Sequence, residues 1–236
     1  MNYDVACITN KGGKAVNEDS VWVKQFPAGI AVCVADGLGS HGGGDIASRA
    51  VVDVLETQMS NSGYSEDSLI EKWFHDADNS IVSLQTPQMP MKSTGVLLVV
   101  ENANAKFAHV GDSRGYMFSA NKVLAQTLDH SIPQMDVFRG NITPAEIRFH
   151  DARNQILQAL GAGGKAEITH LRAPGQRDAF LLCTDGFWEY VYEEEMEIDL
   201  LKSESAAQWL SYMISRLSSR VPDDHDNISV IAVICG

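Results

Sequence analysis

The sequence predicts an α+β fold in which antiparallel sheet dominates. Apolar runs with the length and β-branching of buried strands recur along the chain, and several are separated only by short turns. Strands joined in this way pair antiparallel, because a parallel pair needs a crossover of a dozen residues or more. Segments with helical periodicity follow the first strands and precede the last one, so the helices are segregated from the strands.

The first part of the chain reads as strands followed by two helices. Strands are expected at residues 4–9, from Val21 to Val23, and in the apolar run 30–35 that delivers Asp36 onto Gly37 and a glycine-rich turn. The first helix is expected to begin at Gly44-Asp45. Its apolar face is expected to hold Ile46, Ala50, Val54 and Leu55.

A second helix is expected to begin at Ser65-Glu66-Asp67, with the serine as its cap and acids in its first turn. Its Trp73 and Phe74 are interpreted as core residues, not as a ligand platform. A continuous meander is then expected, with strands at residues 96–100, 106–110, 116–118 and 123–125.

The second half of the chain contains fewer strand signals. Thr143-Pro144-Ala145-Glu146 is typical of a helix start, with a threonine cap, proline at the first position and a glutamate that closes a capping box. Strands are expected at residues 179–184 and 228–234, with a helix capped by Ser205 between them. The acidic segment 189–197 is interpreted as a solvated face.

Acidic residues stand at the ends of several predicted strands. Asp36, Asp112 and Asp185 follow strands, whereas Asp226 precedes the last one and Glu18-Asp19 precede the second. If these strand ends converge, the carboxylates cannot all stay ionised without cations between them, unless their pKa values rise together. Cations between carboxylates are the arrangement of two-metal phosphohydrolases. For Asp36 alone, the alternative is a carboxylate that accepts backbone hydrogen bonds in a turn.

Composition limits the classes of partner. The chain has 236 residues and a formal net charge of −13, which disfavours nucleic acid and anionic membranes as partners. The cysteines Cys7, Cys33, Cys183 and Cys235 form no C-x-x-C pair, so we interpret them as reduced thiols of a cytoplasmic protein. We find no leader, no long apolar span and no linker, and we expect one domain.

Seven short motifs occur in an order that resembles a known family. They are Asn17-Glu18-Asp19, Val34-Ala35-Asp36-Gly37, Ser93-Thr94-Gly95, His109-Val110-Gly111-Asp112-Ser113-Arg114, Asp129-His130-Ser131, Thr184-Asp185-Gly186-Phe187-Trp188 and Asp226-Asn227-Ile228-Ser229. The order resembles that of the metal-dependent protein phosphatases, the PPM or type 2C serine/threonine phosphatases, and especially their compact bacterial branch. The resemblance implies a four-layer αββα sandwich of two antiparallel sheets flanked by helices. It also implies a single catalytic domain over residues 1–236, with a flap subdomain at about 129–160.

The resemblance implies a ligand set for two ions of Mn²⁺ or Mg²⁺. Asp36 would bridge the two ions, and Asp185 and Asp226 would complete the first of them. Glu18 and the carbonyl oxygen of Gly37 would bind the second. Carboxylate and carbonyl oxygens are the ligands that such hard cations prefer.

Three further residues receive roles by resemblance. Asp19 would hold metal-bound water, and Asp112 would help to hold a third, weaker ion. The alternative for Asp112 is a structural Asp–Arg pair. Lys14 stands where the family usually has an arginine that binds the substrate phosphate. Lysine can pair with the phosphate, but only as a point charge without the bidentate fork, and the alternative for Lys14 is a solvated loop lysine.

A second departure concerns proton transfer. Leu38 stands where many eukaryotic members have a histidine that can protonate the leaving oxygen, and leucine has no proton to give. Water or a rearranged His41 are the remaining donors, although we interpret His41 as a structural residue. Asp129 and His130 are expected to hydrogen-bond the neighbouring loop.

The function implied is direct hydrolysis of phosphoserine or phosphothreonine by a water that bridges two metal ions, with Asp36, Asp19 and Lys14 as the catalytic residues. Phosphorylated proteins would be the substrates, in opposition to a bacterial serine/threonine kinase, and we expect a cytoplasmic monomer. One alternative is a catalytically weak, metal-binding phospho-sensor or docking module. Another is a hydrolase of small phosphate esters, although the chain has no P-loop or Gly-x-Gly-x-x-Gly to hold a nucleotide.

Overall fold

The fold is taken from a computed structural model, which describes residues 2–39, 42–62, 66–102 and 104–236. Within these residues the strands form two antiparallel sheets, which we call the β11 sheet and the β3 sheet after one strand of each. The β11 sheet consists, in spatial order, of β1 (Tyr3–Asn10), β11 (Ile228–Cys235), β10 (Ala179–Cys183), β7 (Arg114–Ser119) and β8 (Lys122–Gln126). The β3 sheet consists of β2 (Asp19–Phe26), β3 (Gly29–Leu38), β5 (Gly95–Glu101), β6 (Asn104–Val110) and β9 (Glu167–Leu171), with β4 (Lys92–Ser93) beside β3.

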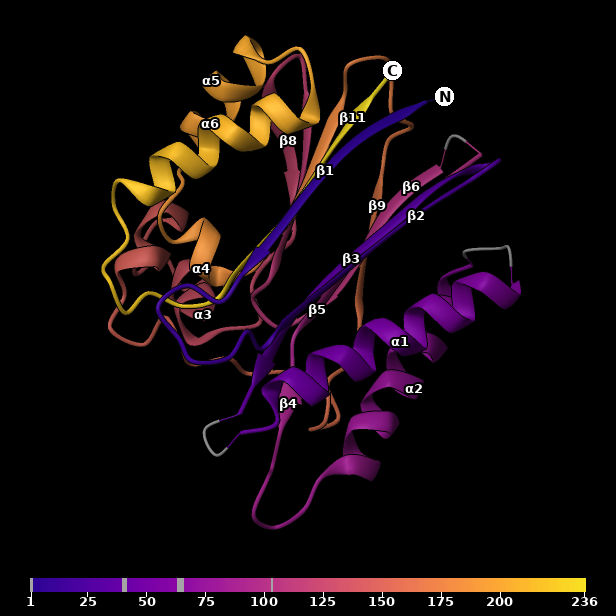
Figure 1. The fold of residues 1–236 in the computed structure, drawn as a ribbon, viewed down its shortest axis with the longest axis vertical. Helices are drawn as coiled ribbons and strands as arrows, with labels where there is room; N and C mark the ends of the chain where they lie inside the picture. Colours follow the sequence, from indigo (N-terminus) through magenta and orange to yellow (C-terminus); the bar gives the residue numbers. More distant parts are fainter. Residues whose placement is uncertain (1, 40–41, 63–65, 103) are drawn as a thin grey trace.

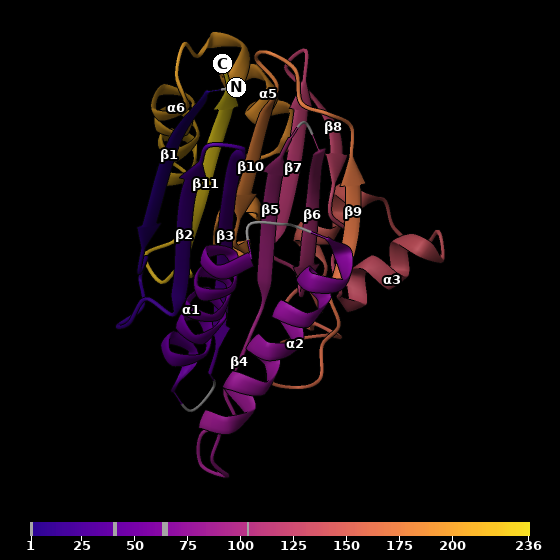
Figure 2. The same cartoon turned by 90° about the vertical axis from the view of Figure 1, so that its right-hand side faces the viewer.

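Helices cover the outer face of each sheet, as Figures 1 and 2 show. The helices are α1 (Gly44–Ser62), α2 (Asp67–Leu84), α3 (Ile132–Phe138), the 3₁₀ helix η1 (Pro144–Phe149), α4 (Asp185–Trp188), α5 (Glu193–Lys202) and α6 (Ala206–Ser218). The pair α1 and α2 packs on the β3 sheet, and α5 and α6 pack on the β11 sheet. This arrangement confirms the four-layer sandwich.

The inner faces of the two sheets bury an apolar layer. Val32, Leu98 and Phe107 of the β3 sheet meet Phe180 and Val233 of the β11 sheet, all without exposure to solvent. Central strands of both sheets are therefore covered on two sides, which explains why β5, β10 and β11 read as continuous apolar runs.

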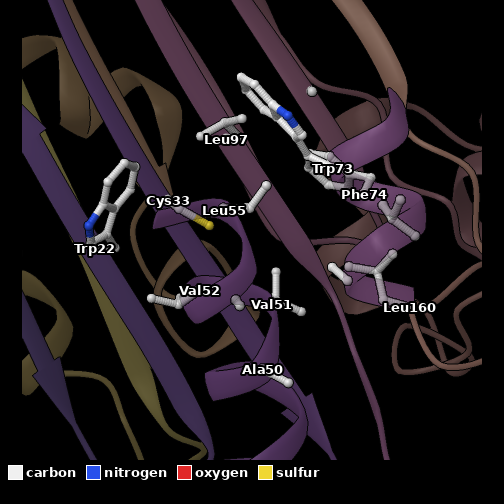
Figure 3. Packing of buried hydrophobic residues seen from close by; sticks show 14 of the residues in the cluster. Trp22, Cys33, Ala50, Val51, Val52, Leu55, Trp73, Phe74, Leu97 and Leu160 are labelled. Atoms are coloured by element: carbon white, nitrogen blue, oxygen red, sulfur yellow. The ribbon is translucent and has the colours of Figure 1, made fainter. Parts of the chain in front are cut away.

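A second core lies between the β3 sheet and its helices. Trp73 and Phe74 of α2 are buried there, as predicted, and Cys33 and Leu97 of the sheet lie among the same side chains (Figure 3). The predicted face of α1 is confirmed for Ala50, Val54 and Leu55 and wrong for Ile46, which is exposed while Ala47 is buried in its place. The helical periodicity was predicted correctly. The small alanine side chains on the buried face let α1 approach the sheet closely. The predicted serine cap of α2, Ser65, lies outside the described residues.

The predicted meander is interrupted between β6 and β7. β6 pairs with β5 and β9 in the β3 sheet, whereas β7 pairs with β8 and β10 in the β11 sheet. The chain crosses from one sheet to the other at Gly111-Asp112-Ser113. Gly111 has φ +100°, and a Cβ there would lie 2.6 Å from Cγ2 of Thr94, so only glycine allows this crossing.

The strand predicted to stop before Asp36 continues through it. β3 extends to Leu38 because the short strand β4 pairs with its end, with Gly37 opposite Ser93 and Leu38 opposite Lys92. Asp36 therefore projects from a strand, and the glycine-rich turn begins two residues later than expected.

The segment 129–160 lies beside the end of the sheets and contains α3 and η1. The capping box predicted at Thr143 is present, since Glu146 Oε2 accepts hydrogen bonds from the backbone N–H and the hydroxyl of Thr143, both at 2.7 Å. The helix that follows is a single 3₁₀ segment. Farther along the chain, Ser205 caps α6 as predicted, accepting from the backbone N–H of Gln208 at 3.2 Å.

The acidic segment 189–197 is more than a solvated face. Glu193 forms an ion pair with Arg148 of η1, and Glu195 accepts hydrogen bonds from Arg216 and Arg220. Glu197 pairs with Lys122 of β8. These partners lie tens of residues away in the sequence, and for that reason the local pattern did not reveal them.

Within the part of the chain that the structure describes, none of the helices has the length and apolar character that crossing a membrane requires.

Candidate metal centre

The acidic strand ends predicted from the sequence converge on one cavity. A cavity of about 530 Å³ is lined by Glu18, Asp36, Asp112, Asp185 and Asp226. It lies at the end of the sheets where β1 ends and β11 begins, opposite the end at which the two chain termini meet. The carboxylates come from both sheets, so the cavity opens across the seam between the two layers.

The β3 sheet contributes one side of the cavity. Asp19 of β2 lies opposite Asp36 of β3 in the antiparallel register, and the backbone N–H of Gly37 donates to the carbonyl oxygen of Glu18 at 3.1 Å. A Cβ at Gly37 would lie 2.0 Å from the carbonyl oxygen of Gly44, so only glycine allows the start of α1 to approach this strand. The close approach lets the backbone N–H of Gly44 donate to Oε1 of Glu18 at 3.2 Å.

The β11 sheet contributes the other side. Asp185 stands two residues after the end of β10 and begins α4, and Asp226 stands two residues before β11. The side chain of Asn227 joins the two sides, because its Oδ1 accepts from the backbone N–H of Glu18 at 2.7 Å. Its Nδ2 donates to the carbonyl oxygens of Lys11 and Val16 at 2.8 and 3.0 Å. Sequence reasoning quoted Asn227 within a motif but assigned it no role.

Burial and mutual repulsion raise the pKa of most carboxyl groups around the cavity. The pKa of Asp36 rises well above its usual value, first because of desolvation and then because of Asp185, Asp19, Asp112 and Asp226. Desolvation is likewise the largest cause of the raised pKa values of Asp19 and Asp185, both about 7.

The pKa values of Asp112 and Glu18 are raised as well, again mainly by desolvation. Protons or cations must therefore compensate this cluster near neutral pH.

Asp19 lies behind the cavity wall, only 8% exposed. Its Oδ2 accepts from the hydroxyl of Thr184 at 3.0 Å, but its Oδ1 is buried and has no hydrogen-bond partner among the described residues. Such an orphan acceptor beside a group of carboxylates needs a donor or a cation to satisfy it. The donor set, with carboxylate oxygens and the Gly37 carbonyl at hand, fits hard divalent cations.

Lys14 lies at the mouth of the cavity. Its Nζ is 3.6 Å from Oδ1 of Asp226, and both side chains are about half exposed. An exposed pair of this kind holds Lys14 only weakly, so its ammonium group can turn toward an anion in the cavity. Lys14 is the one basic side chain among the described residues that line the cavity.

The structural alternative proposed for Asp112 is wrong. Arg114 pairs with Asp129, donating from Nε and Nη2 at 2.8 and 2.7 Å, and not with Asp112. The guanidinium group stacks 3.6 Å from the ring centroid of Trp188, whose Nε1 donates to the carbonyl oxygen of Asp112 at 3.0 Å. This buried arrangement fixes the backbone of Asp112 and leaves its carboxyl group to the cavity.

His130 has the loop-bonding role expected of it. Its Nδ1 accepts from the backbone N–H of Gly111 at 3.1 Å, and its ring stacks on that of His109 with the centroids 4.6 Å apart. Potential ligand atoms of His109, His130 and Glu167 lie within 4.8 Å of one another. Because Nδ1 of His130 accepts a hydrogen bond, its proton is on Nε2, the atom that faces Glu167 at 3.3 Å and would have to bind a metal. A cation fits this second cluster less well than the acidic cavity.

Leu38 lines the cavity, so an apolar side chain occupies the position where a proton donor was considered. His41, the other donor considered, lies outside the described residues. Asn154 and Ile156 also line the cavity, and sequence reasoning gave neither of them a site role. The sequence around these two residues shows only a turn-like pattern. Backbone hydrogen bonds to residues distant in the sequence place the segment beside the cavity.

Known proteins resemble this chain over nearly its whole length. Residues 10–225 match the model of a family described as protein phosphatase 2C. A serine/threonine phosphatase stp of Listeria welshimeri is 34% identical over 212 residues, which are 86% of this chain and 83% of that protein.

Solved structures share the fold. The Mycobacterium tuberculosis serine/threonine phosphatase PstP/Ppp superposes with a TM-score of 0.86 at 27% identity, covering 99% of this chain and 98% of that one. The catalytic domain of the serine/threonine protein phosphatase PstP in complex with two manganese ions gives a TM-score of 0.83 at 25% identity, with 99% of each chain covered.

Proposed function

The chain belongs to the protein phosphatase 2C family, and on that premise we propose that it is a metal-dependent protein phosphatase for phosphoserine and phosphothreonine. The observation that carries the proposal is the meeting of Glu18, Asp36, Asp185 and Asp226 in one cavity. These carboxylates come from four separate parts of the sequence. Because they repel one another, protons or cations must compensate their charge near neutral pH. A site that only stabilised the fold would have no reason to keep such a cluster open to solvent.

The ligands proposed for two ions of Mn²⁺ or Mg²⁺ are those expected from the sequence. Asp36 projects from β3 and is near enough to Asp185 and Asp226 for both to raise its pKa, so it would contact both ions, with Asp185 and Asp226 on the β11 side. Glu18 and the Gly37 carbonyl would serve on the β3 side. Asp112 is proposed for a third, weaker ion, because its buried carboxyl group lines the same cavity. When bound, such ions activate water for attack on phosphorus and neutralise charge on the phosphoryl oxygens.

The remaining residues orient the reactants. Oδ1 of Asp19, for which the described residues supply no hydrogen-bond partner, is proposed to accept a hydrogen bond from the attacking water. Lys14 is proposed to pair with the substrate phosphate from the mouth of the cavity, giving up its weak contact with Asp226. Leu38 donates no proton, so the leaving oxygen of serine or threonine takes its proton from solvent.

The alternative function is that of a catalytically weak phospho-sensor. Lys14 in place of an arginine and Leu38 in place of a histidine both weaken individual steps of turnover. The complete set of acidic ligands favours the enzyme, because a sensor gains nothing from two ions that activate water.

The experiment measures hydrolysis of a phosphothreonine peptide and of p-nitrophenyl phosphate, with Mn²⁺ and after chelation. We expect turnover of both substrates only with metal. Asp226→Asn should lower kcat by about 100-fold, a loss of the size seen when one stabilising group is removed from an active site. Asp223→Asn, an exposed aspartate that does not line the cavity, is the matched control. Metal binding without turnover would support the sensor.

The finer features expected from the sequence remain part of the proposal. We propose that the segment 129–160 acts as a flap beside the site and that the substrates are phosphorylated by a bacterial serine/threonine kinase. The cytoplasmic location and the monomeric state remain predictions.

A further inference from the structure

The metal cavity continues into a second cavity on the surface. The second cavity has a volume of about 560 Å³ and shares Leu38, Gly39, Asn154 and Ile156 with the first. Its other side is formed by the turn before β4 and by the strip of residues 156–164. A molecule that reaches the metal centre with one group can therefore place an adjoining group in the second cavity without leaving the protein surface.

Backbone pairing fixes this second cavity relative to the metal centre. Ser93 and Leu160 exchange N–H···O hydrogen bonds at 3.0 and 2.8 Å, which holds the strip beside β4. β4 in turn pairs with Gly37 and Leu38, and the hydroxyl of Ser93 donates to the carbonyl oxygen of Asp36 at 2.9 Å. At its other end the strip is held by the N–H of Leu157, which donates to the carbonyl oxygen of His130 at 2.6 Å.

The two cavities differ in chemistry. Acidic side chains dominate the metal cavity, whereas none of the described residues that line the second cavity is acidic. Among the described residues of its lining, Leu38, Pro90, Ile156, Leu157, Ala159 and Ala162 are apolar, Asn154 and Gln158 are polar and uncharged, and Lys92 supplies the one charge. Leu157 is 51% exposed, so a large apolar side chain is left partly uncovered at this position.

We propose that the second cavity binds an apolar side chain next to the phosphorylated residue of a protein substrate, and so makes the enzyme prefer phosphosites with apolar neighbours. The proposal rests on the phosphatase function proposed above. A phosphate held at the metal centre brings the flanking residues of the substrate to the boundary between the cavities. There the exposed Asn154 offers an amide donor and acceptor to the passing main chain. An apolar neighbour removes the apolar surface of Leu157 and Ile156 from water, whereas a small polar neighbour such as serine covers less of that surface.

Two phosphothreonine peptides test the proposal. One carries leucine and the other serine on both sides of phosphothreonine, so the direction of binding need not be known and both have the same charge. For the wild-type protein with Mn²⁺ we expect kcat/KM to be about tenfold higher for the leucine peptide, the discrimination that an open apolar site supplies. Leu157→Ser should reduce this ratio to about two or less.

The matched control is Leu124→Ser in β8. Leu124 is also 51% exposed but lines neither cavity, so this variant should keep the wild-type ratio. Because each variant is judged by a ratio of two substrates, a general loss of activity does not imitate the expected result. Equal kcat/KM values for the two peptides in the wild type, or an unchanged ratio in Leu157→Ser, would overturn the assignment of the second cavity while the phosphatase function stands. Absence of metal-dependent hydrolysis of p-nitrophenyl phosphate by the wild type would overturn both.

Discussion

Replacing Asp185 by asparagine should stabilise the metal-free protein at alkaline pH while it removes a proposed metal ligand. In the folded chain the pKa of Asp185 is raised from 3.8 to about 7, mainly by desolvation and then by Asp226 and Glu189. The folded protein therefore keeps a proton that the unfolded chain has already released. The stability that this proton provides is complete below about pH 4 and is lost as the pH rises toward about 7. Asparagine carries no charge at any of these pH values and avoids the loss.

The size of the effect follows from the shift. A change from 3.8 to about 7 is about three pKa units, which corresponds to about 4 kcal/mol at about pH 8. Asp185 is only half-buried and faces a cavity that water can enter, so the expected gain in unfolding free energy is about 2–4 kcal/mol. At about pH 4 the folded carboxyl group is protonated and the unfolded one is only partly ionised, so the gain should fall below about 1 kcal/mol.

Urea unfolding after chelation, followed by tryptophan fluorescence, measures this difference directly. Adding Mn²⁺ should narrow the difference, because the wild type gains the free energy of binding the ions, about 2.7 kcal/mol at a hundredfold excess over Kd. Asp53→Asn on the exposed face of α1 controls for the loss of one negative charge. If metal-free Asp185→Asn were no more stable than the wild type at about pH 8, desolvation and the neighbouring carboxylates would not be raising the pKa of Asp185.

Three further predictions concern individual side chains. Lys14→Arg should lower KM for a phosphothreonine peptide severalfold, because a guanidinium group can bind phosphate with two hydrogen bonds, and unchanged steady-state kinetics would contradict phosphate binding at this position. Arg114→Met should lower the unfolding free energy by about 3–5 kcal/mol, because Asp129 would remain buried without its partner; urea unfolding tests this, and a loss below about 1 kcal/mol would count against the buried pair. Leu38→His should add a limb near about pH 6.5 to the pH–rate profile that the wild type lacks, since the new imidazole would titrate inside the cavity. A profile identical to that of the wild type would mean that residue 38 does not reach the reacting groups.

The sequence predicted the strands and most of the helices well, because buried strands such as β5 and β11 are uninterrupted apolar runs. It also indicated which acids would meet, since each stands at the end of such a run. The crossing at Gly111-Asp112-Ser113 could not be predicted, because nothing in the local pattern tells a strand which of two similar sheets it will join. The short strand β9, whose side chains are only partly buried, lacks an apolar run and was missed for that reason.

Contacts between distant segments were the other limit. The pairing of Arg114 with Asp129, and not with Asp112 two residues away, depends on Trp188 beneath the guanidinium group. The second cavity could not be foreseen either, because it exists only where Ser93 meets Leu160.

Because the cavity lies between the β3 sheet and the β11 sheet, binding of the proposed ions would affect how firmly the two sheets are held together. The ion proposed to be bound by Asp36 of one layer and by Asp185 and Asp226 of the other would tie together two sheets that adhere mainly through apolar side chains. Chelation should then leave the apolar layer intact but let this edge of the sandwich open and close more often. Backbone amides of Asp36 in one layer and Asp185 in the other would exchange their hydrogens faster in concert, although they belong to different sheets.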